Sequence, residues 1–288
     1  MIPVAFDYAA PASIDEALAL LAEAGDEGKI LAGGQSLIPV LKLRLAAPRM
    51  VIDLGKIDEL RGISEEGDVL VIGAMTPHHE VANSALVAQH ASLIAKATQT
   101  VADPQIRHRG TFGGALVHAD PAGDLPAPAL ALDAQFVIAG PGGSRTVAAV
   151  DFFVDLFTTA VGEDEILTQV RIPKKTGWLS DYQKFTRVAQ QWSIVGVAAT
   201  FRVESGTIAE ACIGLTNMGS VPLRAGSVER TLVGCALEEG AISQATASAG
   251  DGTDPPTDIN GDADYRRHLA SVLTKRAILG AVPLARAA

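Results

Sequence analysis

The sequence has 288 residues, enough for about two domains, and carries a formal net charge of −10. Its Lys and Arg residues form no basic stripe, which excludes nucleic-acid binding driven by phosphate contacts. Charge or glycine interrupts every apolar run before it is long enough to cross a bilayer. The N-terminus lacks a basic segment followed by an apolar one, so we expect a cytoplasmic protein.

The cysteine and histidine content argues against a metal on this chain. Cys212 and Cys235 are too few for a disulfide framework or for an iron–sulfur cluster, which usually needs four Cys ligands. The six histidines show no metal-ligand spacing. We therefore expect any metal chemistry to belong to another chain.

A small βαβαβ unit is predicted at the start of the chain. Strands are expected at residues 3–8, 29–32 and 50–54, and helices follow Ser13 and Ser36. Ser13 and Glu16 have the spacing of a capping box, which marks a helix N-terminus.

The glycine turn, residues 33–36 with the sequence G-G-Q-S, connects the second strand of this unit to its second helix. Free N–H groups at a helix N-terminus favour an anion, and Gln35 and Ser36 add side-chain donors. A plain strand-to-helix connection is the alternative interpretation.

The next segment is predicted to contain a strand at residues 68–74 and a helix at residues 84–98. Thr76 is expected as an N-cap, with Pro77 at the first helical position. Arg107 and Arg109 precede a second pair of glycines, and such residues are more often solvated loop charges than phosphate ligands.

Residues 110–127 carry that second pair, Gly113 and Gly114, in a composition that is untypical of a regular helix or strand. We expect a backbone nest for a diphosphate, with the Thr111 hydroxyl as a further donor. Asp-Pro and Asp-Leu-Pro sequences then predict a tight, non-helical path, with His118 in a loop. A glycine-rich turn between strands is the alternative.

The remaining pattern places strands before helices, which indicates an α+β domain after a boundary at residues 174–177. Before that boundary we expect an apolar turn at 129–132, strands at 135–139, 146–150 and 165–172, and an aromatic helix at 151–157. Beyond it we expect an antiparallel meander at 180–187, 194–203 and 208–216, then helices at 224–233, 237–249 and 263–280. Residues 251–262 lack the spacing of a calcium loop and are predicted to be an exposed loop.

The usual dinucleotide fingerprint, the P-loop and a Ser/His/Asp set are all missing from the sequence. Two Gly-Gly motifs without a catalytic constellation predict a protein that binds a phosphorylated cofactor and leaves the chemistry to it.

Four segments together resemble one family. They are A-G-G-Q-S at 32–36, T-F-G-G-A at 111–115 followed by D-P-A-G-D-L-P-A, I-G-L-T-N at 213–217, and Y-R-R at 265–267. The chain is similar, over essentially its whole length, to the flavin (medium) subunits of molybdenum hydroxylases. That family includes the FAD subunit of aerobic carbon monoxide dehydrogenase and the flavin domain of xanthine dehydrogenase.

The resemblance implies an α+β fold with a two-subdomain FAD-binding domain at 1–175, divided into a βαβαβ unit at 1–55 and a mixed α/β subdomain at 56–175. A C-terminal domain of antiparallel sheet and helices would span 176–288. FAD would lie between the first two subdomains. The implied FAD contacts are Ala32, Gly33, Gly34, Gln35, Ser36, Leu37, Thr111, Gly113, Gly114, Ala115, Asp124, Leu167, Lys184 and Trp192.

Some of these positions are open to a second interpretation. Leu167, Lys184 and Trp192 fit core packing or surface as well as cofactor contact. Ala115 stands where the family commonly has Asn or Ser, so one side-chain donor is missing there. No residue of this chain is expected to be catalytic.

The resemblance also implies a function. The chain would be an electron-transfer subunit that passes electrons from [2Fe-2S] clusters, through FAD, to an external acceptor. A large subunit would carry the molybdopterin and a small one the clusters, in a dimer of heterotrimers, with any membrane association peripheral and through partners or acceptor. A stand-alone flavoprotein oxidoreductase and a non-enzymatic nucleotide-binding module are the alternatives. The substrate, whether carbon monoxide, an aldehyde or an N-heterocycle, and the acceptor stay open.

Overall fold

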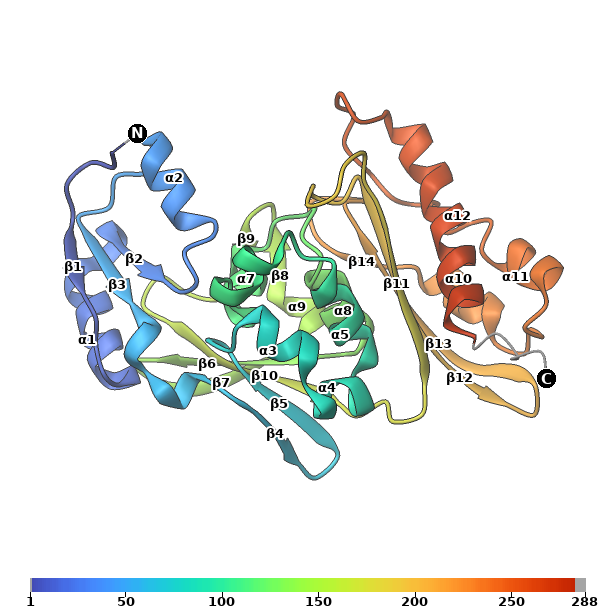
Figure 1. Ribbon diagram of the computed structural model, residues 1–288, viewed down its shortest axis with the longest axis horizontal. Helices are drawn as coiled ribbons and strands as arrows, with labels where there is room; N and C mark the ends of the chain where they lie inside the picture. The colour runs from blue at the N-terminus through green and yellow to red at the C-terminus, as the bar shows by residue number, and fades with distance from the viewer. Residues whose placement is uncertain (1, 283–288) are drawn as a thin grey trace.

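Three units follow one another along the molecule: an N-terminal βαβαβ unit, a middle sheet with helices, and a C-terminal sheet backed by helices (Figure 1). The structure is a computed structural model and describes residues 2–282. Within that range, no helix is both long and apolar enough to span a bilayer. The α+β class predicted from the sequence is confirmed.

The N-terminal unit is built around a parallel sheet of order β1-β3-β2. Its elements are β1 (Asp7–Ala9), α1 (Ile14–Ala24), β2 (Gly28–Leu31), α2 (Leu37–Leu43) and β3 (Met50–Asp53), with short 3-10 turns at Gly25–Glu27, Leu54–Lys56 and Asp58–Leu60. Ser13 caps α1 by accepting from the Glu16 N–H at 3.2 Å, and the Glu16 carboxylate accepts from the Ala12 N–H at 2.8 Å. The capping signal in the sequence therefore places this helix correctly.

The middle unit contains an antiparallel sheet of order β4-β5-β10-β6-β7. Its strands are β4 (Ile63–Glu66), β5 (Val69–Gly73), β6 (Gln135–Gly140), β7 (Gly143–Ala148) and β10 (Ile166–Pro173), beside a separate pair, β8 (Phe153–Asp155) and β9 (Thr158–Thr159). Its helices are α3 (His78–Asn83), α4 (Ala85–His90), α5 (Ser92–Gln99), α6 (Pro104–Arg109), α7 (Phe112–His118), α8 (Pro126–Ala131) and α9 (Ala149–Phe152). Phe136 and Phe152 stack at 3.7 Å between ring centroids in its core.

Two helix predictions in the middle unit are wrong because distant backbone groups compete with the helix. Thr76 is not an N-cap: its buried hydroxyl bonds to both the N–H and the C=O of Gly62, and Pro77 is the N-cap of α3. The helix expected at 84–98 breaks at Ala91. The His90 carbonyl accepts from the Lys175 N–H at 2.8 Å, and this bond takes the place of a helical one.

Other boundaries in the middle unit also differ from the predicted ones. Residues 129–132 lie mostly in α8 rather than in a turn, and the strand expected at 146–150 is β7, which ends at Ala148. The aromatic helix expected at 151–157 stops at Phe152 and continues as β8, so that Phe153 also reaches Phe136. The short elements β4 and α6 were not predicted.

The C-terminal unit confirms the predicted meander. It is an antiparallel sheet of order β11-β12-β13-β14, formed by β11 (Leu179–Phe185), β12 (Val195–Glu204), β13 (Thr207–Thr216) and β14 (Leu223–Arg224). The helices α10 (Gly226–Leu232) and α12 (Ala263–Ala281) cover the outer face of the sheet, and α11 (Glu239–Ala245) packs against these two helices (Figure 1). The helices α5 and α8 of the middle unit pack against the other face of the sheet. The loop at 251–262 is anchored because Asp258 pairs with the fully buried Arg266 at 2.7 Å.

Candidate functional site

The glycine turn leaves β2 and leads directly into α2. Gly34 has φ +73°, a conformation that favours glycine, and Gln35 Nε2 donates to the Gly33 carbonyl at 2.9 Å. Between Ile2 and Val282, no group accepts a hydrogen bond from the backbone N–H of any residue from Gly33 to Leu37. Because these residues are only half-buried, their N–H groups are available to an anionic ligand.

The sequence predicts a backbone nest at the second glycine pair, and this prediction is wrong. Gly113 and Gly114 lie in the first turn of α7. Thr111 is the N-cap and accepts from the Gly114 N–H at 3.1 Å, while the Gly113 N–H donates to the Ala74 carbonyl at 2.8 Å. Both amides are therefore already satisfied within the protein. His118 is the last residue of this helix rather than part of a loop.

Close approach explains both glycines of α7. A Cβ on Gly113 would lie 2.5 Å from the Ala74 Cβ, and one on Gly114 would lie 2.6 Å from the Thr111 Oγ1 and 3.2 Å from the Ala32 Cβ. The missing side chains let α7 pack against β5 and against the residue before the glycine turn. Their role is therefore to let α7 pack closely, and their N–H groups are not free to donate to a ligand.

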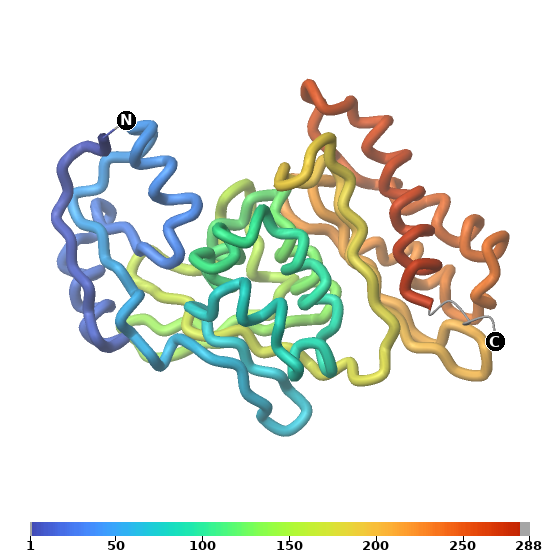
Figure 2. The backbone as a smooth tube through the Cα atoms, viewed as in Figure 1, coloured from blue at the N-terminus to red at the C-terminus, as the bar shows by residue number. Residues whose placement is uncertain are grey.

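The two motifs, far apart in sequence, lie against each other. A Cβ on Gly33 would collide with the Arg109 carbonyl oxygen and lie 2.6 Å from the Gly110 Cα. The backbone trace shows the loop after β2 reaching toward the middle unit at this point (Figure 2). The free N–H groups of the glycine turn thus lie next to the N-terminal end of α7.

The two arginines before α7 lie in the helix α6 rather than in a loop, and only Arg109 is exposed as the sequence suggested. Arg107 Nη1 donates to the Val101 carbonyl at 2.8 Å and so closes the loop before α6. Arg109 is exposed, and its backbone carbonyl faces Gly33.

Asp124 lies at the centre of a buried polar network that joins the middle and C-terminal units. Its Oδ2 accepts from Lys184 Nζ at 2.8 Å, and its Oδ1 accepts from Tyr182 OH and Ser193 Oγ at 2.9 Å each. Burial raises the pKa of Asp124, while the charge of Lys184 acts in the opposite direction. Two expected cofactor contacts, Asp124 and Lys184, are therefore bonded to each other.

The other expected contacts have different environments. Trp192 is 54% exposed in the loop between β11 and β12, next to Ser193. Leu167 is buried in the core of the middle unit, and Ala115 is half-buried on α7. Tyr182 and Ser193 were missed by the sequence reasoning, since hydroxyl residues in a strand and a loop carry no signal of a shared carboxylate.

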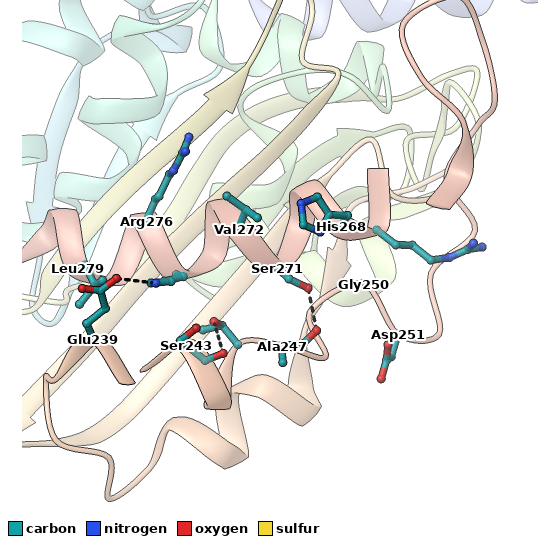
Figure 3. A pocket seen from close by; sticks show the side chains of 13 residues that line it. Glu239, Ser243, Ala247, Gly250, Asp251, His268, Ser271, Val272, Arg276 and Leu279 are labelled. Atoms are coloured by element: carbon teal, nitrogen blue, oxygen red, sulfur yellow. Dashed lines mark hydrogen bonds and ion pairs between the residues drawn. The ribbon is translucent and has the colours of Figure 1, made fainter. Parts of the chain in front are cut away.

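Two open grooves lie away from the glycine turn. One, of about 850 Å³, runs between α11 and α12 and presents Ser243, Ser271 and Arg276 (Figure 3). The other, of about 750 Å³, includes Asp120 and Phe157. None of the fourteen expected cofactor contacts lines either groove, so the grooves are separate from the candidate site.

Comparison with known protein families identifies the family to which this chain belongs. Residues 4–175 match the FAD binding domain in molybdopterin dehydrogenase, and residues 180–281 match the CO dehydrogenase flavoprotein C-terminal domain. The chain belongs to this family. It is an FAD-binding subunit of the dehydrogenase class, and the resemblance seen in the sequence is confirmed.

Relatives of the family match nearly the whole chain. The carbon monoxide dehydrogenase medium chain of Hydrogenophaga pseudoflava is 41% identical over 281 residues, which are 96% of this chain and 97% of the relative. A solved carbon monoxide dehydrogenase from the same organism, lacking the Mo-pyranopterin moiety, superposes with a TM-score of 0.94 at 42% identity and covers 98% of each chain. Quinoline 2-oxidoreductase from Pseudomonas putida 86 gives a TM-score of 0.93 at 34% identity, again over 98% of each chain.

The residues at the glycine turn fit the FAD of this family. A diphosphate needs several hydrogen-bond donors, and the N–H groups of residues 33–37 are free to donate. The Ser36 hydroxyl makes no capping bond within the described residues and can also donate to a ligand. The turn is therefore suited to the cofactor that defines the family.

Proposed function

We propose that this chain is the FAD-binding electron-transfer subunit of a heterotrimeric-type molybdenum hydroxylase that resembles carbon monoxide dehydrogenase. Electrons would arrive from [2Fe-2S] clusters on a small partner subunit and leave to an external acceptor. A large partner subunit would hold the molybdopterin and oxidise the substrate. Bound FAD would supply the redox chemistry, because a flavin can accept electrons one at a time and release two.

The observation that supports this proposal most strongly is the row of free N–H groups from Gly33 to Leu37 beside the start of α7. These groups, with Ala32, Gln35 and Ser36, would hold the diphosphate. Their partial positive charge at the start of α2 compensates the negative charge of a diphosphate.

The remaining residues have supporting roles in the proposal. Thr111, Gly113, Gly114 and Ala115 would bring the α7 backbone close to the cofactor. Asp124 and Lys184, bonded at 2.8 Å, would fix the C-terminal unit beside the site. Leu167 and Trp192 would contact other parts of the FAD, and the exposure of Trp192 leaves its ring accessible.

The assembly and its location complete the proposal. The expected complex is a dimer of heterotrimers in the cytoplasm, with domain limits in this chain at 1–175 and 176–288. The large subunit would select the substrate. The named relatives act on molecules as different as carbon monoxide and quinoline, as expected if the large subunit selects the substrate.

Titration of the isolated chain with FAD tests the proposal directly. The full-length protein, stripped of flavin, is expected to quench FAD fluorescence with one FAD bound per chain. Gly34→Ala serves as the site variant, and Gly25→Ala as the control, because both glycines have positive φ but only Gly34 lies in the turn. Wild-type protein that takes up no FAD would contradict the proposal and favour a module for another nucleotide.

A further inference from the structure

His78 is the first residue of α3 and lies against Gly110, the residue that Gly33 of the glycine turn approaches. Its backbone N–H donates to the Gly110 carbonyl at 2.9 Å, and its side chain is buried at 3% exposure. Pro77, just before it, forms an isolated antiparallel bridge with Thr111, the N-cap of α7. The start of α3 is thus bonded to the segment that leads into α7.

The imidazole ring of His78 occupies the space where a side chain on Gly110 would lie. A Cβ on Gly110 would be 2.8 Å from the ring Cδ2 and 3.1 Å from its Nε2. The same glycine is approached by the turn, because a Cβ on Gly33 would lie 2.6 Å from the Gly110 Cα. A continuous line of contacts therefore runs from the His78 ring through Gly110 to Gly33.

Stability does not explain a histidine at this position. In the described part of the chain, the buried Nδ1 of His78 has no hydrogen-bond partner. Burial, aided by the charge of Arg107 on α6, lowers the pKa of His78 to about 4, so the ring is neutral at pH 7. An apolar side chain of similar size would avoid the unpaired nitrogen.

We propose that His78 is a positioning residue of the FAD site, whose ring fixes Gly110 and thereby sets the spacing between the glycine turn and the N-terminal end of α7. The proposal rests on the proposed function in one respect, that FAD is the ligand of the turn. It assigns His78 no contact with the cofactor.

A double-mutant cycle between His78 and Gly110 tests the inference, with FAD affinity measured by fluorescence titration of the full-length apoprotein. His78→Ala removes the ring, and Gly110→Ala adds a methyl group that collides with it. Each single variant is expected to weaken FAD binding by about tenfold or more, whereas the double variant returns to within about threefold of wild type, because the new methyl group fills the vacated space. Gly110 has φ −62°, so alanine fits its backbone conformation.

Two controls separate positioning from general destabilisation. His79→Ala changes an exposed residue of the same helix and is expected to leave FAD affinity unchanged. The apoprotein melting temperature is expected to vary far less among the variants than FAD affinity does. Should His78→Ala fail to fold, the smaller polar variant His78→Asn replaces it in the same cycle.

The outcomes distinguish this inference from the proposed function. Wild-type protein that binds no FAD overturns the proposed function. Wild-type protein that binds FAD, with single-variant losses that simply multiply in the double variant, overturns only the role of His78. FAD losses that follow the apoprotein melting temperatures variant by variant also overturn it.

Discussion

Lys184 Nζ lies 2.8 Å from Asp124 Oδ2 and joins the C-terminal sheet to the loop that follows α7. Only 10% of the Lys184 side chain and 4% of the Asp124 side chain are exposed. Three donors converge on this one carboxylate, counting Tyr182 and Ser193. The relative placement of two domains thus depends on a buried charge that is paired and hydrogen-bonded.

Lys184→Met is expected to lower the free energy of unfolding by about 3–5 kcal/mol, because it leaves the Asp124 carboxylate buried without its counter-charge. The matched control is Arg171→Met, which removes a more exposed pair with Glu66 and is expected to cost about 0–1 kcal/mol. Chemical denaturation measures both. Equal losses of unfolding free energy in the two variants would show that the buried pair contributes no more to stability than the exposed one.

Acid sensitivity provides a second prediction through His78. Its pKa is about 4 in the folded protein and 6.5 without the fold, so the unfolded chain binds a proton more readily between these values. The stability present above pH 6.5 is therefore lost as the pH falls toward 4. At pH 4.5 this residue accounts for a loss of about 2–3 kcal/mol in the free energy of unfolding.

His78→Gln, which does not titrate, should reduce the difference in unfolding free energy between pH 7 and pH 4.5 by that amount. The exposed neighbour His79→Gln is the control. An unchanged difference in His78→Gln would mean that the His78 ring is not held neutral by burial.

The glycine turn gives a third prediction. Gly34→Ala should abolish FAD retention, since its Cβ would lie 2.7 Å from Ile38 Cδ1 and strain a backbone at φ +73°. Gly25→Ala carries the same type of strain, at φ +59°, but its Cβ meets nothing within 4 Å, so FAD should be kept. Flavin absorbance per mole of purified chain is the measurement, and equal flavin content in both variants would remove the turn from the site.

A fourth prediction separates the two glycine motifs. Gly113→Ala should lower both stability and flavin content, because its Cβ would lie 2.5 Å from the Ala74 Cβ and push α7 off β5. Gly142→Ala, in the hairpin between β6 and β7, has open space around it and should change neither. Loss of flavin from Gly113→Ala without loss of stability would support the prediction from the sequence that these glycines form a diphosphate nest.

Local signals were sufficient where a structure depends on neighbours in the sequence. Ser13 and Ser84 mark the starts of α1 and α4, and the alternation of apolar residues placed the C-terminal meander. The strand–turn–helix setting of Gly34 also predicted the part of the candidate site whose N–H groups are free within the described residues.

Local signals failed where a distant partner decides the outcome. The sequence around Gly113 and Gly114 is typical of a nest, but Thr111 is the N-cap of a helix that contains both residues. The Thr111 hydroxyl accepts from the Gly114 N–H, and the Ala74 carbonyl accepts from the Gly113 N–H. The break at Ala91 depends on Lys175, and the environment of Asp124 depends on Lys184. The residues next to each partner in the sequence give no signal that predicts these long-range bonds.

Analysis of FAD, molybdenum and iron in the material that co-purifies with the tagged chain from its native host tests the central claim most directly. The account predicts one FAD per chain, with molybdenum and iron on two further subunits that stay bound to it. A chain that purifies alone, with its flavin and full dehydrogenase activity, would contradict the account and identify a stand-alone flavoprotein.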